Sequence, residues 1–385
     1  MTDRHFSLIL LATLQCNADC AYCFEDKTED RLTLPRLTEI IDKVLVYLEE
    51  EGIGTLTLYW QGGEALLLPP GWYAQAHERI QRAADRRGIT VRHSLQTNLL
   101  AYSPKWNGVI AGMFGNSVGT SADYPNRYRR RPGQTPADYD ARWRRKLAEA
   151  RAAGIAVAVI AIPNRDTLAV GADRFYVYFV EELGVTDFQV NTPFPGGRPN
   201  AAKQDMPLDD LQGLSRFYRE LADVWIARGR SQGVRIGPFD ALLDYFSDRP
   251  ACLPCIWREN CASGFLAIDA RGRVAQCDCW VTSYPAHRYG DLFASASLGE
   301  LLRASAARRR FAERPLALVQ REDCIDCDYL SLCHGGCPVR ACTVHGELFE
   351  KDPYCSLYRD LFRHLEQAAA RLAWDPVTPG AAPAR

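Results

Sequence analysis

Apolar and polar residues alternate in blocks along the first 230 residues, in a way that predicts strands followed by helices. Residues 6–14 are almost continuously apolar, which indicates a buried strand, and residues 34–51 carry apolar side chains at helical spacing. Further strands are expected at 55–60, 91–97, 113–121, 155–162 and 187–191, and further helices at 72–87, 139–153, 175–183 and 208–228.

Six such strand–helix repeats within ~200 residues favour an α/β fold, with a parallel sheet and the helices outside it. Six units are too few for the usual eight-unit barrel, so we expect a partial (β/α)6 TIM-like barrel over residues 1–235. A flat, doubly wound sheet stays open as the alternative.

The pattern changes after residue 248, where strand and helix signals become short and broken. Eleven of the 14 cysteines lie between Cys252 and Cys355. Residues 265–268 and 274–276 predict a small hairpin. We therefore expect a second, cysteine-rich domain over residues 236–365, in which bound metal replaces part of a hydrophobic core.

The chain is expected to finish with a helix at 356–373. Residues 366–385 would be the end of that helix and a loose tail rich in Pro and Ala.

Composition limits the classes of function. The formal net charge is −1, which gives no general electrostatic case for nucleic acid or an anionic membrane as partner. The apolar run at residues 6–11 is too short to span a bilayer and has no signal-peptide cleavage site. We expect a cytoplasmic protein, whose clustered cysteines indicate metal or catalysis rather than disulfides.

Three cysteines follow the first strand directly. Cys16, Cys20 and Cys23 have the spacing C-x3-C-x2-C, on a loop where parallel α/β folds place their chemistry. Three thiolates can hold three irons of a [4Fe–4S] cluster and leave the fourth iron open to a ligand such as S-adenosylmethionine (SAM). Zinc is the alternative, but structural zinc sites take four closed ligands, and this loop has no nearby histidine.

The triplet and the segments after it resemble the radical SAM superfamily. Tyr22 precedes the third cysteine, and Trp60-Gln61-Gly62-Gly63-Glu64 is similar to the GGE element of that family. The resemblance implies that Gly62, Gly63 and Glu64 hold the SAM ammonium group, with an aromatic such as Tyr22 against adenine. It also implies that SAM is lined by residues at the ends of the third and fourth strands, namely Gln96, Thr97, Asn98, Ser121 and Asp123. Polar residues at strand ends can equally be caps or turn formers.

The later cysteines resemble the SPASM extension, the auxiliary-cluster domain of many radical SAM enzymes. The resemblance rests on Gly272-x4-Cys277, Cys324-x2-Cys327-x5-Cys333-x3-Cys337 and Cys355. It implies two auxiliary [4Fe–4S] clusters, three clusters in all, with two zinc knuckles as the alternative. One auxiliary cluster would use Cys255, Cys261, Cys277 and Cys337, and the other Cys324, Cys327, Cys333 and Cys355. Cys252, Cys279 and Cys342 would be spare, although Cys252 or Cys279 could replace a ligand of the first set.

Asp278 directly follows Cys277, where anaerobic sulfatase-maturating enzymes are proposed to have a base. Oxidation after hydrogen abstraction requires a proton acceptor, which this carboxylate would supply; a turn-forming aspartate is the alternative. A basic run follows Asp123. It is interpreted as a solvated face, with a clamp for a substrate carboxylate as the alternative, and consists of Arg127, Arg129, Arg130 and Arg131.

These features predict a radical SAM oxidoreductase that matures a peptide or protein by hydrogen abstraction. The product would be a crosslink, as in ribosomal peptide (RiPP) natural products, or an oxidised side chain, as in formylglycine-generating sulfatase maturases. A small-molecule dehydrogenase or epimerase and a non-catalytic metal scaffold are the alternatives. The expected partners are the substrate and an external one-electron reductant of flavodoxin or ferredoxin type. Because the chain begins at the first strand, without room for a leader-binding domain, the substrate would bind the core itself or come with a separate leader-binding protein.

Overall fold

The computed structural model describes residues 4–194, 210–259, 261–262 and 264–373, and in this part the strands form two sheets. The first has the order β10-β9-β8-β1-β2-β3 and the second the order β4-β5-β6-β7. The first sheet consists of β1 (His5–Thr13), β2 (Thr55–Gly62), β3 (Thr90–Leu95), β8 (Phe265–Asp269), β9 (Arg273–Ala275) and β10 (Gly290–Asp291). The second consists of β4 (Ser117–Ser121), β5 (Ala156–Ala161), β6 (Asp187–Val190) and β7 (Arg235–Gly237).

One parallel bridge joins the two sheets. Gln96, just after β3, pairs with Gly119 of β4, and the Thr97 amide donates to the Gly119 carbonyl at 3.0 Å. Each adjacent pair along β1-β2-β3 and β4-β5-β6-β7 is parallel. The result is the predicted open α/β barrel rather than a flat sheet, and the carboxyl ends of its strands face one mouth.

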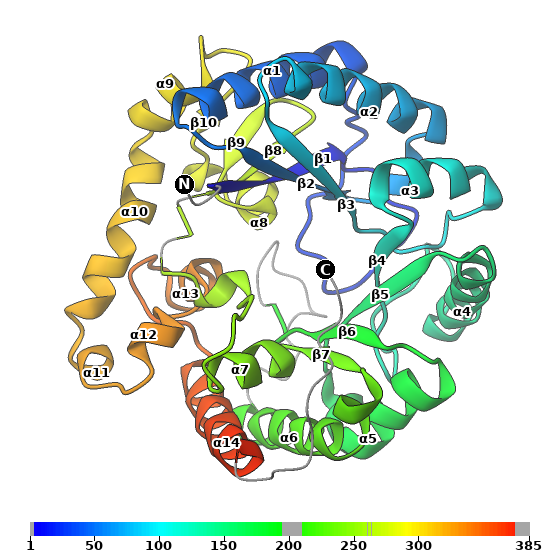
Figure 1. The fold of residues 1–385 in the computed structure, drawn as a ribbon, viewed down its shortest axis with the longest axis vertical. Coiled ribbons are helices and arrows are strands. Elements are labelled where there is room, and N and C mark those ends of the chain that lie inside the picture. Colours follow the sequence, from blue (N-terminus) through cyan, green and yellow to red (C-terminus); the bar gives the residue numbers. More distant parts are fainter. Residues whose placement is uncertain (1–3, 195–209, 260, 263, 374–385) are drawn as a thin grey trace.

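The first six helices lie outside this curved row of strands (Figure 1). They are α1 (Leu34–Glu50), α2 (Pro70–Asp85), α3 (Asn107–Phe114), α4 (Pro136–Ala152), α5 (Arg165–Tyr176), which continues as a π-helical segment Val177–Glu182, and α6 (Leu211–Val224). In α1, the side chain of Thr33 caps the N-terminus, because its hydroxyl accepts a hydrogen bond from the Arg36 amide. Leu37, Ile41 and Val44 lie on the buried face of this helix.

The C-terminal part closes the open side of the barrel (Figure 1). Its helices are α7 (Phe239–Tyr245), α8 (Asp278–Ser283), α9 (Leu298–Ala304), α10 (Ala306–Val319), α11 (Glu322–Ile325), α12 (Leu330–Cys333), α13 (Pro338–His345) and α14 (Cys355–Ala373). The predicted hairpin is present as β8 and β9, but β8 also pairs in parallel with β1. The hairpin therefore extends the barrel sheet, which its local sequence does not reveal.

Two predictions of secondary structure are wrong, and one short strand was not predicted. Residue 113 belongs to α3 and not to a strand, because Gly115 takes a left-handed φ of +59° and ends that helix before β4 begins. The region after 248 is less broken than expected, since α10 is 14 residues long; its apolar positions are interrupted by Arg308-Arg309-Arg310 and Pro315. The three-residue strand β7 is too short for a periodic signal.

Residues 208 and 209 of the helix predicted at 208–228, and the tail 374–385, lie outside the described residues. None of the helices that the structure describes is long and apolar enough to cross a membrane.

Candidate functional site

The loop that carries Cys16, Cys20 and Cys23 leaves the carboxyl end of β1. All three thiols are partly buried, and backbone bonds hold the loop against the segment after β4: the Asp19 amide donates to the Arg130 carbonyl at 2.7 Å. Burial is the main cause that raises the pKa of the Cys16 thiol to about 12, and the charges of Glu64 and Cys20 act in the same direction. A bound metal centre replaces the proton of a cysteine thiol and would favour the thiolate at this buried position.

The spacing of the thiols and the type of their donor atoms bear on the metal centre that they fit. Four thiolates around zinc at 2.3 Å would lie about 3.8 Å apart. Among the described residues, only Cys277, Asp278 and Cys279 bring three ligand atoms within 4.8 Å of one another. The thiols of the Cys16 triplet and of the two auxiliary sets are not gathered this closely in the described residues, and all-sulfur donors of this kind fit iron–sulfur clusters.

Gly62 and Gly63, at the end of β2, pack against the segment before the cysteine loop. A Cβ on Gly63 would lie 2.2 Å from the Gln15 carbonyl oxygen, and one on Gly62 would lie 2.4 Å from that of Thr13. Gly62 also has a φ of +131°. The space that these glycines leave is filled by the chain leading into Cys16, so they set the position of the cysteine loop.

Glu64 ties the ends of β2 and β3 together. Its carboxylate is buried and accepts hydrogen bonds from the Leu66 amide (2.9 Å), the Thr97 hydroxyl (2.5 Å) and the Asn98 amide (2.7 Å). Burial raises its pKa, and these bonds oppose that rise. A SAM ammonium group at Glu64 would share an already hydrogen-bonded carboxylate.

Residues after β3 and β4 complete the mouth. The Asn98 side chain donates to Asn17 at 2.7 Å and reaches the Cys16 sulfur at 3.9 Å. The Gln96 amide donates to the Ser121 hydroxyl at 3.3 Å. These predicted SAM-lining side chains are therefore brought to the same edge as the cysteine loop.

Asp123 and Tyr22 belong to a buried ion-pair network. The Tyr22 hydroxyl donates to Asp123 at 2.6 Å, the Arg129 Nε donates to the same oxygen at 2.9 Å, and the Ile162 amide donates to the other oxygen at 3.2 Å. Arg129 is 7% exposed and Asp123 2%. Both Asp123 oxygens are thus engaged inside the protein, which the sequence did not indicate.

Asp278 lies beside Gln61, at the same mouth. The Gln61 amide donates to Asp278 at 2.5 Å, and the Cys279 amide donates to the other carboxylate oxygen at 2.9 Å. Glu25 is a further acid that sequence reasoning missed, held by the Thr282 hydroxyl at 2.9 Å. Burial raises the pKa of both carboxyls, and Asp278 adds to the rise at Glu25. Glu25 stands two residues after Cys23, which is the one signal that could have identified it.

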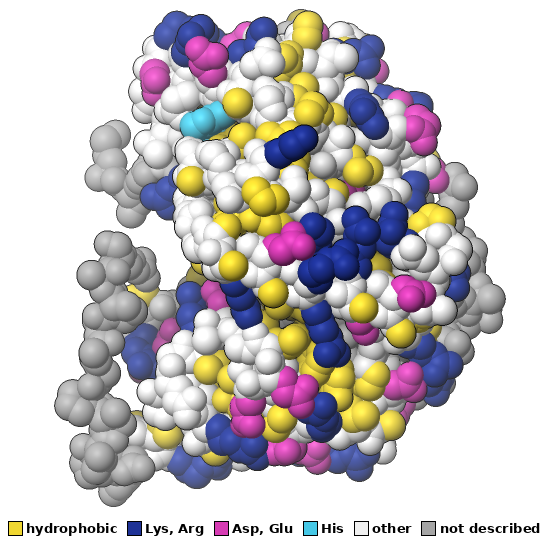
Figure 2. Space-filling model, turned by 90° about the vertical axis from the view of Figure 1, so that its right-hand side faces the viewer, with side chains coloured by type: hydrophobic (Ala, Val, Ile, Leu, Met, Phe, Trp, Pro, Cys, Tyr) yellow, Lys and Arg dark blue, Asp and Glu magenta, His cyan; other side chains and the backbone are white. Residues whose placement is uncertain are grey.

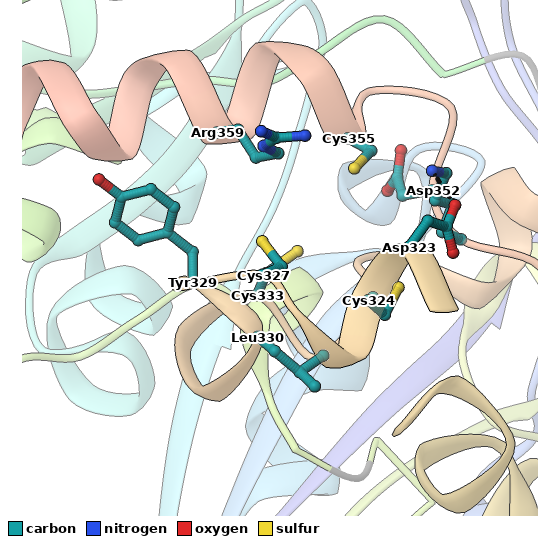
Figure 3. Close-up of a pocket in the computed structure, with 11 residues that line it drawn as sticks. Asp323, Cys324, Cys327, Tyr329, Leu330, Cys333, Asp352, Cys355 and Arg359 are labelled. Carbon is teal, nitrogen blue, oxygen red and sulfur yellow. Dashed lines mark hydrogen bonds and ion pairs between the residues drawn. The ribbon is translucent and has the colours of Figure 1, made fainter. Parts of the chain in front are cut away.

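The structure brings the later cysteines together in two groups, whose assignment as ligand sets stays a prediction. The first set is mutually close: the Cys261 thiol lies within electrostatic reach of Cys277, Cys337 and Cys255. In the second set, Cys333 is close to Cys355 and Cys327, and Cys324 to Cys355. Figure 3 shows the labelled second-set cysteines around a common pocket, which Asp323, Lys351, Asp352 and Arg359 also line.

The three spare cysteines have different surroundings. Cys252 is exposed. Cys279 is buried, with its sulfur 3.6 Å from Asp278, and Cys342 lies 3.6 Å from the His287 Nε2. Cys279 is therefore the spare thiol placed beside Cys277.

The basic run is tied to the protein's own acids. Arg127 pairs with Asp166 at 3.2 Å and Arg130 with Asp19 at 3.9 Å, while the buried Arg129 is not the solvated residue expected. In the face drawn in Figure 2, basic side chains gather near the middle with acidic and hydrophobic ones around them. These pairings weaken the case for a substrate clamp.

Comparison with known proteins finds a family domain in the first half of the chain and full-length relatives at low identity. Residues 10–167 match the Radical SAM superfamily. A cysteine-type anaerobic sulfatase-maturating enzyme of Clostridium perfringens is 23% identical over 375 residues, covering 93% of this chain and 95% of the relative. A serine-type enzyme of Klebsiella pneumoniae is 25% identical over 336 residues, covering 84% and 79%.

Solved structures give the fold. The structure of anSMEcpe with bound AdoMet and Cp18Cys peptide has a TM-score of 0.79 at 21% identity, covering 95% of this chain and 98% of that one. Streptococcus suis SuiB bound to its precursor peptide SuiA has a TM-score of 0.57 at 14% identity, covering 92% and 76%. The chain therefore carries a radical SAM domain over residues 10–167 and has, along nearly its whole length, the fold of an anaerobic sulfatase-maturating enzyme.

Proposed function

We propose that the protein oxidises one residue of a peptide or protein substrate, after abstraction of a hydrogen atom from that residue. The observation that carries this proposal is the Gln61–Asp278 hydrogen bond, which holds a carboxylate at the mouth that also carries the Cys16 loop. When bound, SAM and a cluster on Cys16, Cys20 and Cys23 would supply a 5′-deoxyadenosyl radical, and clusters on the other two sets would take up an electron.

The residues of the chain would supply orientation and proton transfer. Asp278 would accept the proton that the substrate loses with its electron, because a side chain needs such a base to end at the oxidised level. Gln61 would hold the carboxylate in place, and its second amide hydrogen could meet the substrate. Gly62, Gly63 and Glu64, with Gln96 to Asn98, would fix SAM against the cysteine loop.

Side-chain oxidation is favoured over crosslinking. The names of the sulfatase-maturating relatives specify a cysteine or a serine as the target, and these relatives match 84–93% of this chain. Two residues of the basic run considered above as a clamp for a substrate carboxylate, Arg127 and Arg130, are paired with acids of the chain itself. Crosslinking is the second candidate, supported by the likeness of the fold to SuiB with its precursor peptide.

The test is an anaerobic assay of the reconstituted full chain with SAM, a reductant and sulfatase-type peptides containing serine or cysteine, beside peptides encoded nearby. We expect 5′-deoxyadenosine, a loss of two hydrogens at serine, and a product that reacts with a hydrazide. A peptide that loses two hydrogens without hydrazide reactivity would indicate a crosslink instead. If SAM were not cleaved, or if the triple variant C16A/C20A/C23A cleaved it equally well, the proposal would be wrong.

A further inference from the structure

A buried arginine lies between the two sets of cysteines in the C-terminal part. Arg314, on α10, is 5% exposed. Its guanidinium donates hydrogen bonds to the carbonyls of Gly336 (3.1 Å), Gly335 (3.1 Å), Leu348 (2.9 Å) and Glu350 (3.0 Å). The donors are thus directed at backbone dipoles, which satisfy hydrogen bonds but carry no net charge.

The two glycines place this guanidinium next to both sets. Gly335 and Gly336 separate Cys333, of the second set, from Cys337, of the first. They have φ of +80° and +71°, and a Cβ on either would meet another side chain at 2.4 Å. Only glycine fits this turn, so the two carbonyls that bind Arg314 are held between the two groups of thiols.

The charge of Arg314 has no carboxylate partner within ion-pair distance among the described residues. Asp352 acts on Arg314 from beyond ion-pair distance, and it is otherwise engaged: it accepts from the Cys337 amide at 2.8 Å and pairs with the buried Arg340 at 3.4 Å. The groups that lie close enough to balance Arg314 include the thiols of Cys261, Cys337 and Cys333. An unbalanced buried cation is costly, and anionic thiolate-bound clusters on both sides would remove that cost.

We propose that Arg314 raises the reduction potentials of the two auxiliary clusters and so makes them acceptors for the electron that leaves the substrate. A fixed positive charge stabilises the reduced, more negative state of each cluster more than the oxidised state, and burial strengthens this effect. The proposal deepens the function proposed above and rests on its auxiliary clusters. It assigns Arg314 a positioning role in electron transfer, without contact with substrate.

The test is an anaerobic redox titration followed by electron paramagnetic resonance. The full chain is reconstituted in the C16A/C20A/C23A background, so that only the auxiliary clusters give signals. We expect Arg314→Gln to lower the midpoint potentials of these clusters by about 59 mV or more. For a one-electron couple this is a tenfold change in the reduction equilibrium constant. Arg314→Lys, which keeps the charge, should shift them less, and Arg309→Gln, at an exposed position of the same helix, should leave them unchanged.

A second variant keeps the proposal testable if Arg314→Gln does not hold iron. Asp352→Asn removes a negative charge that acts on Arg314, while its amide oxygen can still accept from the Cys337 amide, so the potentials should rise. Iron analysis of the unsubstituted chain comes first: fewer than three clusters would count against the proposed function itself. With all clusters present, unchanged potentials in Arg314→Gln, or a fall in Asp352→Asn, would overturn the role of Arg314 alone.

Discussion

The side-chain amide of Gln61 donates a hydrogen bond of 2.5 Å to the carboxylate of Asp278, although 217 positions separate the two residues. Gln61 is the last residue but one of β2, and Asp278 begins α8, shortly after the hairpin strand β9. The contact forms because β8 pairs with the free edge of β1, which brings the start of α8 to the mouth of the barrel. The pair links the radical SAM domain to the cysteine-rich region.

Replacing Asp278 by Asn should separate SAM cleavage from substrate oxidation. The amide keeps the shape of the side chain but cannot accept the proton, so product should fall by roughly 10²-fold or more. Formation of 5′-deoxyadenosine should continue. Chromatography of the nucleoside and mass analysis of the peptide measure the two steps. Asp328→Asn, at an exposed acid, is the matched control; equal losses of both products in D278N would contradict a base role.

Single cysteine substitutions should divide the later cysteines into ligands and spare thiols. Cys277→Ala and Cys324→Ala each remove a ligand from a different four-cysteine set, so each should lose about one third of the iron, one cluster of three. Cys252→Ala and Cys342→Ala should retain it. Iron analysis with visible absorbance measures this. An unchanged iron content in C324A, or the loss of one cluster in C342A, would contradict this assignment of the ligands.

Gly63→Ala should empty the SAM-binding cluster site while leaving the auxiliary clusters filled. A methyl group there would meet the Gln15 carbonyl at 2.2 Å, and backbone cannot move aside as a side chain can. The loop carrying Cys16 would be displaced. The same substitution at Gly71, where a Cβ meets nothing within 4 Å, is the control. Iron analysis decides, and normal iron content in G63A would show that the loop adapts.

Loss of Arg129 should destabilise the protein far more than loss of its neighbour Arg130. Arg129→Met leaves the buried Asp123 carboxylate without its cation, which typically costs about 3–5 kcal/mol. Arg130→Ala removes a partly exposed pair with Asp19 and should cost about 0–1 kcal/mol. Urea unfolding under anaerobic conditions measures both; similar midpoints for the two variants would contradict the burial argument.

His93 should make the fold sensitive to mild acid. Its Nδ1 accepts from the Trp60 indole at 3.1 Å, and burial lowers the pKa of His93 to about 3. The unfolded chain, with a pKa near 6.5, takes up the proton first, so stability is present above about pH 6.5 and is lost as the pH falls. Between pH 6 and pH 5, the free energy of unfolding of the His93→Gln variant should therefore fall by about 1 kcal/mol less than that of the unsubstituted chain.

Unfolding midpoints at the two pH values measure this difference. His345→Gln, at an exposed position, should show the same pH dependence as the unsubstituted chain. If the free energy of unfolding of H93Q depended on pH as strongly as that of the unsubstituted chain, protonation of the buried ring would not destabilise the fold.

Local signals in the sequence determined the barrel and its cysteine loop. Apolar periodicity places β1, β2, β5 and β6 and the helices α1, α2, α4, α6 and α14 within a few residues, because it reflects burial of one face or of a whole strand. The spacing of Cys16, Cys20 and Cys23 after an apolar run is likewise local, so the sequence alone predicts three thiols at a strand end. The periodic signal failed at residue 113 and in α10, where a glycine stop and charged residues interrupt it.

Only the tertiary structure decided which distant side chains meet. Asp123 is predicted to line SAM, and the structure adds that its carboxylate is bound by Tyr22 and Arg129. Gln61 became the partner of Asp278, and Arg314 came to lie between two groups of thiols, through pairings that no sequence period encodes. The physical reason is that a buried charge or hydrogen bond is satisfied by whatever the folded chain brings near it, and that choice depends on strand order and helix packing rather than on neighbours in sequence.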